Sequence, residues 1–186
     1  MKVLKGNLKG RNLISPQHIR PVAVRIKKAC FDILREEIEG KKILDLFSGS
    51  GSLGIEALSC GAKEAVFVDI KRDCVEKIKQ NLAFFKLTAK SEVHLKDAFR
   101  AIEDFYKNGE TFDLIFLDPP YYKGMLIKAL QALRDYDILT PLGYLVAFCY
   151  AKDEFVNNDG RFFLIVHKNY GQTLVLIYKK QEIPKD

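Results

Sequence analysis

Residues 44–54, LDLFSGSGSLG, decide the fold, because they join an apolar strand to a helix through a glycine-rich loop. The pattern predicts the strand at residues 42–47 and the helix at residues 52–59. The glycines of a GxGxxG pattern are Gly49, Gly51 and Gly54. Glycine permits backbone conformations and close approaches that a Cβ would block. We therefore predict a ligand-binding loop at the carboxyl end of a parallel strand.

Strands and helices alternate along the chain around this loop. Before it, apolar spacing and Pro21 predict an amphipathic helix over residues 21–40. After it come four more predicted strands, at residues 64–69, 92–96, 112–117 and 143–149. The helices between them are predicted at residues 72–85, 98–107 and 124–135. This alternation predicts a mostly parallel sheet covered on both faces.

The end of the chain departs from that alternation. Two apolar stretches, residues 162–167 and 174–178, are separated by little more than Tyr170-Gly171-Gln172. So short a connection permits only an antiparallel pair. The fold class is therefore α/β, with a mostly parallel seven-stranded sheet that ends in an antiparallel hairpin.

Basic residues are concentrated at the N-terminus. The chain has a net charge of +6. Eight lysines and arginines precede Asp32, which is the first acidic residue. Residues 1–20 are interpreted as a basic extension, with a small β-hairpin as its expected form. Such a segment suits a polyphosphate partner, since each neutralised phosphate releases counterions. A solvated surface explains it equally well, and both readings stay open.

Length and composition limit the class of protein. The 186 residues fit a single domain, 1–186, and 48% hydrophobic content supplies a core. No apolar run reaches the roughly 18 residues of a membrane span. The four cysteines are scattered, so neither a disulfide framework nor a metal site is expected. We predict a cytoplasmic protein without a metal, for which nothing requires more than a monomer.

Acidic residues at the ends of three strands suggest the ligand. Asp69 lies 20 residues after Gly49, where a carboxylate can accept hydrogen bonds from a ribose diol. A dinucleotide and S-adenosylmethionine both fit. Asp45 favours the latter, because a carboxylate would repel pyrophosphate but can face an α-amino group. Asp97 and the Ala98 N–H are candidates for the adenine, although Asp97 is equally well explained as a helix N-cap.

The stretch Asp118-Pro119-Pro120-Tyr121 follows the predicted fourth strand and carries the chemistry. Two prolines form a stiff turn without N–H donors. Asp118 and the Pro119 carbonyl can therefore accept both hydrogens of an exocyclic amine, with its lone pair toward a methyl donor. Tyr121 supplies a face for stacking a flipped base. A rigid turn is the alternative, and the glycine loop earlier in the chain argues against it.

These motifs, LDLFSGSGSLGIEALSCGA, VFVD and LDPPY, resemble the class I, Rossmann-like methyltransferases of the N6-adenine/N2-guanine type. Over nearly the whole chain the sequence is most similar to the RsmD family, bacterial enzymes that methylate guanine N2 in 16S ribosomal RNA. The resemblance implies S-adenosylmethionine as cofactor. It implies ribosomal RNA, or an assembling small ribosomal subunit, as partner. It also implies a last strand inserted antiparallel beside the fifth.

The resemblance assigns roles to residues of this chain. The catalytic set is Asp118, Pro119, Pro120 and Tyr121. The cofactor would contact Asp45, Phe47, Ser48, Gly49, Ser50, Gly51, Asp69, Ile70, Asp97, Ala98 and Asp118. The RNA would contact Lys5, Lys9, Arg11, Arg20, Arg25 and Tyr121. One segment departs from the family, because the hydroxyl and the acid that usually follow its Arg-Pro are absent after Arg20-Pro21. That departure leaves the nucleotide open.

Two other functions remain as alternatives. An amino-methyltransferase could act on adenine in DNA or on a glutamine amide in protein, since both present a planar NH₂. A nicotinamide-dependent oxidoreductase would also use a GxGxxG loop, but Asp45 and the proline turn argue against it. A pure binding module fits least, because it would not need Asp118.

Overall fold

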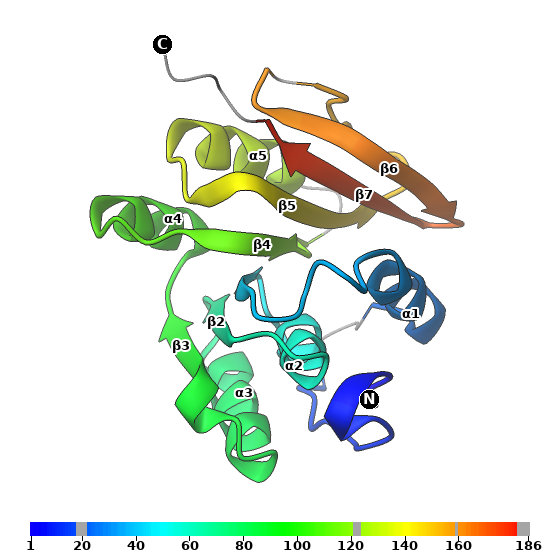
Figure 1. Cartoon of the computed structure of the whole chain (residues 1–186), viewed down its shortest axis with the longest axis vertical. Helices are drawn as coiled ribbons and strands as arrows, with labels where there is room; N and C mark the ends of the chain where they lie inside the picture. Colours follow the sequence, from blue (N-terminus) through cyan, green and yellow to red (C-terminus); the bar gives the residue numbers. More distant parts are fainter. Residues whose placement is uncertain (18–21, 121–123, 159, 182–186) are drawn as a thin grey trace. The chain divides into compact units, whose positions relative to one another are not determined.

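The computed structural model describes residues 1–17, 22–120, 124–158 and 160–181, which contain seven strands and five α-helices. They belong to two units, Met1–Ala98 and Phe99–Asp186, each with its own strands and helices (Figure 1).

The first unit contains three parallel strands, β1 (Lys42–Leu46), β2 (Glu64–Asp69) and β3 (Ser91–Leu95). They lie in the order β3-β2-β1, with Asp45 opposite Phe67 and Asp69 opposite Leu95. Because the strands are parallel, their carboxyl ends share one edge of the sheet. The glycine loop, Asp69 and Asp97 therefore all follow that edge, as predicted.

Two helices of the first unit pack closely on these strands. In α2 (Ser52–Ser59) every residue is buried, and α3 (Arg72–Phe84) buries one face, which includes Cys74 and Asn81. Gly54 is required by this packing, since a Cβ there would lie 2.3 Å from Phe67 Cε1. A short 3-10 helix, η2 (Thr88–Lys90), leads into β3. Helix α2 therefore rests on β2 directly behind the glycine loop.

The helix before the loop is shorter than predicted. Helix α1 spans Val24–Ile33, and turns occupy residues 34–40. Leu34 and Ile38 are both buried within those turns. Their apolar side chains therefore extended the helix-like spacing in the sequence beyond the end of the helix. Three glutamates, at 36, 37 and 39, follow the helix C-terminus, where the helix dipole disfavours negative charge. These charges disfavour extension of the helix into residues 36–39.

Within the described residues 1–17, the N-terminal segment doubles back as an irregular hairpin, with one antiparallel bridge in place of two regular strands. An antiparallel bridge joins Lys2 to Asn12, and a 3-10 helix, η1 (Gly6–Leu8), forms the turn between them. The Val3 N–H donates to the Arg11 carbonyl at 2.9 Å, and the Leu13 N–H to the Met1 carbonyl at 2.7 Å. Val3 and Leu13 are buried, so the segment is anchored by apolar side chains as well.

The second unit contains β4 (Phe112–Leu117), β5 (Leu139–Tyr150), β6 (Phe162–Tyr170) and β7 (Thr173–Lys180). Strand β4 pairs parallel with β5, whereas β5–β7 and β7–β6 are antiparallel (Figure 1). The helices are α4 (Ala98–Lys107) and α5 (Met125–Asp135). Phe105 of α4 meets Phe112 edge to face, with 5.2 Å between ring centroids. The predicted antiparallel hairpin is confirmed.

Strand β5 begins four residues earlier than predicted. Its first part is irregular: the register with β4 shifts between Phe112 and Leu114, and Leu142 has a φ of 60°. Pro141 and Gly143 gave this part the pattern of a turn. Gly143 is needed because a Cβ there would lie 2.9 Å from the Asp113 carbonyl oxygen.

The fold class predicted from the sequence is confirmed, since mostly parallel strands alternate with helices and end in an antiparallel pair. Within the described ranges, no helix combines the length and the apolar character needed to cross a membrane.

Candidate functional site

The loop after β1 alternates in backbone handedness. Phe47, Gly49 and Gly51 have φ angles of 60°, 57° and 73°, whereas the serines between them keep the ordinary negative sign. The N–H groups of this loop are used within the protein: Gly49 donates to the Asp69 carboxylate and Gly51 to the Ser48 carbonyl. Helix α2 begins at Ser52, directly after the loop, and its first N–H groups have no partner within the helix. A carboxylate fits this position.

Asp45 fixes the C-terminal end of the loop, where α2 begins. Its carboxylate is 1% exposed, and Oδ2 accepts the Gly54 N–H at 2.9 Å. A backbone donor thus offsets part of the cost of burying this charge. The predicted contact with an α-amino group remains a prediction. The structure shows that Asp45 also has a structural role, in tying α2 to β1.

Asp69 fixes the N-terminal part of the loop, at Gly49. Its Oδ2 accepts the Gly49 N–H and its Oδ1 the Lys71 N–H, both at 2.8 Å. The Ser48 hydroxyl, which also contacts the Asp45 carbonyl, bonds to the backbone of Val68 at 3.0 and 3.1 Å. The carboxylate predicted to bind a ribose is therefore oriented by the loop itself.

The remaining predicted cofactor residues lie along the same edge. Ile70 follows Asp69 and is 66% exposed, which offers a flat apolar surface beside the carboxylate. The Lys96 N–H donates to the Asp69 carbonyl at 3.1 Å, which brings the end of β3 next to the end of β2. Asp97 is half-buried and Ala98 is buried at the start of α4. The first unit thus gathers Asp45, the loop, Asp69, Ile70, Asp97 and Ala98 at one sheet edge.

A cysteine that the sequence reasoning did not use lies beside Asp69. Cys74, in the first turn of α3, is fully buried. Burial, the negative charges of Asp69 and Asp73 and a hydrogen bond to Asp69 raise the pKa of its thiol to about 12. This cysteine is therefore a protonated donor to the carboxylate and not a nucleophile.

Asp118 follows β4 in the second unit, as predicted, and its environment differs from that of Asp69. The side chain is half-buried, Pro119 is buried and Pro120 is exposed. Burial raises the pKa of Asp118 to about 7. Because Leu117 pairs with Ala147, Asp118 lies close to Cys149, and burial together with Asp153 and Asp118 raises the pKa of that thiol to about 12. Tyr121, predicted for base stacking, lies outside the described residues.

The residues predicted to contact RNA divide into three groups. Lys9, Arg11 and Arg25 are exposed. Lys5 forms an ion pair with Asp32, so part of its charge is already neutralised within the protein. Arg20 lies outside the described residues. Exposed positive charge is therefore present on the N-terminal segment and at the start of α1.

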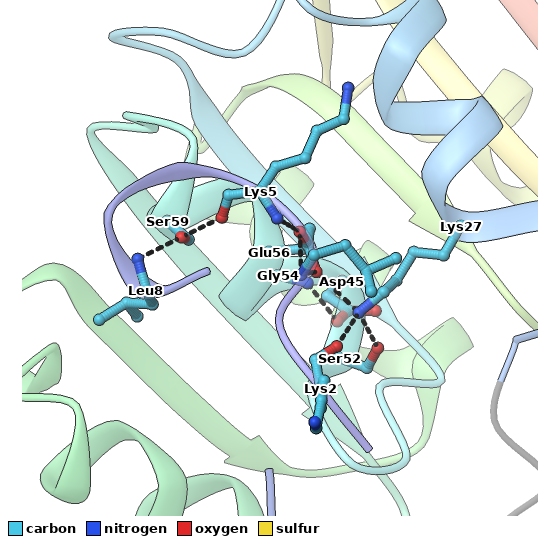
Figure 2. A network of polar contacts seen from close by, with 10 residues as sticks. Lys2, Lys5, Leu8, Lys27, Asp45, Ser52, Gly54, Glu56 and Ser59 are labelled. Atoms are coloured by element: carbon cyan, nitrogen blue, oxygen red, sulfur yellow. Dashed lines mark hydrogen bonds and ion pairs between the residues drawn. The ribbon is translucent and has the colours of Figure 1, made fainter. Parts of the chain in front are cut away.

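The sequence reasoning missed a buried ion pair, between Lys27 of α1 and Glu56 of α2 (Figure 2). Their side chains are 1% and 0% exposed, with 2.7 Å between Lys27 Nζ and Glu56 Oε2. Lys27 also donates to the Lys2 carbonyl at 3.2 Å and to Ser52 Oγ at 3.1 Å. A signal existed, because Glu56 is the one acid in an otherwise apolar helix sequence. Its cationic partner, however, is set by tertiary packing.

Solved structures similar to this chain identify the class. An Escherichia coli structure, yhhF, provisionally described as a methyltransferase, has a TM-score of 0.86 and 25% identity, and the match covers 97% of this chain and 98% of that one. A Haemophilus influenzae structure, HI0767, provisionally described as a methylase, has a TM-score of 0.81 and 29% identity with the same coverage. The fold and its loops define a methyltransferase of the Rossmann-like class.

The chain belongs to the RsmD family, whose model, described as "conserved hypothetical protein 95", matches residues 1–179. The Bacillus subtilis protein YlbH, which bears the provisional name of an rRNA methyltransferase, is 36% identical over 97% of this chain and 100% of its own length. Ribosomal RNA small subunit methyltransferase D of Escherichia coli K12 is 30% identical, over 73% of this chain and 67% of its own. The resemblance seen in the sequence is confirmed.

Proposed function

We propose that this protein transfers a methyl group from S-adenosylmethionine to the exocyclic N2 amine of a guanine in 16S ribosomal RNA. The observation that carries this proposal is the glycine loop of the first unit. It leads directly into the N-terminus of α2, which favours an anion, and it is held between Asp45 and Asp69 at the edge that also carries Ile70 and Asp97. Family membership directs the choice of substrate toward ribosomal RNA.

The residues at this edge match the parts of the cofactor. The start of α2 suits the methionine carboxylate, and Asp45 suits the α-amino group. Asp69, already oriented by two N–H donors, presents its remaining acceptor capacity to the ribose hydroxyls. The exposed side chain of Ile70 would contact the adenine, and Asp97 would accept a hydrogen bond from its amine. The bound cofactor supplies an electrophilic methyl group.

Asp118 and the Pro119 carbonyl would hold the target amine. Each accepts one N–H hydrogen, which aims the nitrogen lone pair at the methyl carbon. The new N–C bond forms as the S–C bond breaks, and its electron pair stays on sulfur. The nitrogen then loses one proton. With a pKa of about 7, Asp118 is well matched to take that proton near neutral pH.

Exposed Lys9, Arg11 and Arg25 would contact the phosphate backbone, which supplies affinity rather than base recognition. Tyr121 would stack on the flipped guanine. Ribosomal RNA large subunit methyltransferase I of Tolumonas auensis is also similar, at 33% identity over 58% of this chain and 30% of that protein. A position in the large-subunit ribosomal RNA is therefore the second candidate substrate.

The decisive experiment maps methylation on 16S rRNA from a strain that lacks this gene. We expect one guanine to lose its N2 methyl group, and a plasmid with the wild-type gene, but not the Asp118→Ala variant, to restore it. Unchanged rRNA methylation would reject the substrate. A labelled-methyl assay on RNA, DNA and protein fractions then tests the other acceptors. Calorimetry with S-adenosylhomocysteine and NADH tests the cofactor, since binding of NADH alone would favour an oxidoreductase.

A further inference from the structure

Polar side chains of the first unit hold the N-terminal arm, residues 1–14, by its backbone. Glu56 accepts the Leu4 and Lys5 N–H groups at 2.8 and 2.6 Å (Figure 2). Ser59 Oγ accepts the Leu8 N–H at 2.9 Å and donates to the Lys5 carbonyl at 2.6 Å. The chain passes so close to Ser59 that a Cβ at Gly6 would lie 1.8 Å from its carbonyl oxygen. The arm is thus docked on α2.

A second anchor, Asn81 of α3, holds the other end of the arm. Asn81 is 1% exposed. Its Oδ1 accepts the Ile14 N–H at 2.9 Å, and its Nδ2 donates to the Ile14 carbonyl at 2.8 Å. The second Nδ2 hydrogen is directed at the Ser50 carbonyl, 3.4 Å away. Both donors and the acceptor of the amide are therefore used, which fixes its orientation.

The Ser50 carbonyl belongs to the cofactor loop. It lies between Gly49 and Gly51, both at positive φ, in a segment whose glycines give its peptide planes unusual freedom. Contacts must therefore hold the loop in its alternating conformation. Asp69 fixes the Gly49 N–H, the Ser48 carbonyl accepts the Gly51 N–H at 2.7 Å, and Asn81 faces the Ser50 carbonyl. Of these three, only Asn81 joins the loop to the arm.

We propose that Asn81 is a positioning residue for the cofactor, and that through it the affinity of the loop depends on the docking of Ile14. This inference rests on the proposed cofactor site. The coupling is reciprocal by thermodynamic necessity: a cofactor that favours the held loop also favours the docked arm. The Lys2–Lys27–Ser52 contacts provide a second connection, from the start of the arm to the first residue of α2.

The test is Asn81→Asp, which is nearly isosteric and retains an acceptor for the Ile14 N–H. It removes both donors and turns a carboxylate toward two carbonyls. By calorimetry we expect the Kd for S-adenosylhomocysteine to rise about 10-fold, the scale of one lost hydrogen bond. The matched control is Ser59→Ala, which loosens the arm at Lys5 and Leu8 without touching the loop. Its Kd should stay within about twofold of wild type.

Two further measurements separate positioning from general destabilisation. In the wild-type protein, S-adenosylhomocysteine should slow hydrogen exchange at the Ile14 N–H, and Asn81→Asp should abolish that slowing. In turnover assays the variant should raise the cofactor KM and leave kcat at saturating cofactor nearly unchanged. A lower kcat with an unchanged KM would contradict the proposal.

The outcomes distinguish this inference from the proposed function. Wild-type protein that binds no S-adenosylhomocysteine would overturn both. Wild-type binding with an unchanged Kd in Asn81→Asp would overturn the inference alone. If S-adenosylhomocysteine left hydrogen exchange at the Ile14 N–H unchanged, the inference would also be overturned. That measurement uses only the wild-type protein, so it does not depend on the folding of a variant.

Discussion

The buried carboxylates of the first unit and the half-buried Asp118 of the second lie in two different kinds of environment. Asp45, Glu56 and Asp69 each accept at least one backbone N–H, at 2.6–2.9 Å. Asp118 instead lies where burial raises the pKa of its carboxyl to about 7. The first group is held by backbone donors, whereas Asp118 can exchange a proton near neutrality.

This difference matches the two tasks proposed for the glycine loop after β1 and for the Asp118 segment after β4. A site that orients a cofactor needs acceptors whose charge and geometry stay constant. A site that receives a proton from an amine needs an acid whose pKa lies near the working pH. A perturbed pKa at one strand end, beside well-satisfied acids elsewhere, is typical of such a division.

The largest effect should follow from making Glu56 an uncompensated buried charge. In Lys27→Met the carboxylate keeps its backbone donors and loses the cation at 2.7 Å. Removing one partner of a buried ion pair costs about 3–5 kcal/mol, so the free energy of unfolding should fall by that amount. Urea denaturation followed by circular dichroism measures it.

Two controls sharpen this prediction. The double variant Lys27→Met/Glu56→Gln removes the orphaned charge and keeps an oxygen for the arm's N–H groups, so it should regain much of the loss. Lys42→Met breaks a partly exposed pair with Glu64, at 3.3 Å, and should change stability little. If Lys27→Met were as mild as Lys42→Met, the pair would not support the arm and α2.

Asp118→Ala should have the next largest effect. Loss of the acceptor that orients the amine should reduce the methylation rate at least about 100-fold, the scale of one lost transition-state contact. Binding of S-adenosylhomocysteine should be retained, because the loop and its acids belong to the first unit. Single-turnover assays and calorimetry measure the two quantities. A rate within a few-fold of wild type would remove Asp118 from the mechanism.

Local sequence patterns predicted the elements around these acids well. Helix α2, β2, α4 and β4 begin and end where the apolar spacing places them. Each is bounded by a glycine turn or by a change from strand to helix periodicity. The sequence also identified four candidate acids, because each lies inside or shortly after an apolar strand. They are Asp45, Asp69, Asp97 and Asp118. Position along the chain was enough to find them.

What the sequence did not reveal depends on contacts between distant residues. Lys27 and Glu56 are 29 positions apart, and neither pattern alone indicates that the two charges meet in the core. Asn81 lies 67 positions from Ile14 and sits on the buried face of an ordinary amphipathic helix. The raised pKa of Asp118 is likewise a property of burial, which the motif does not encode.

Asp69→Asn should weaken the cofactor rather than the chemistry. The amide keeps one oxygen for either the Gly49 or the Lys71 N–H, but it loses the charge that would bind the ribose diol. Hydrogen bonds to charged groups are worth about 1.5–3 kcal/mol, so the Kd for S-adenosylhomocysteine should rise about 10- to 100-fold. Glu76→Gln, on the exposed face of α3, is the matched control. An equal rise in both variants would indicate a nonspecific effect of charge.

The smallest effect is the pH dependence of the rate. Since an acceptor must be ionised, the single-turnover rate should rise as pH increases through about 7 and then level off. Stability should change in the opposite sense. Because the folded pKa lies above the ordinary aspartate value of 3.8, folding takes up a proton between these values, and the contribution of Asp118 to stability is lost as pH rises through about 7.

Asp118→Asn tests both trends, because it keeps an acceptor oxygen and removes the titration. The rate should then be independent of pH between about 6 and 8, and the melting temperature should fall less with pH than in wild type. If the wild-type rate were already flat over that range, the proton would leave by another route and Asp118 would act only by orienting the amine. Asp118 would then serve only to orient a ligand, as the carboxylates of the first unit are proposed to do.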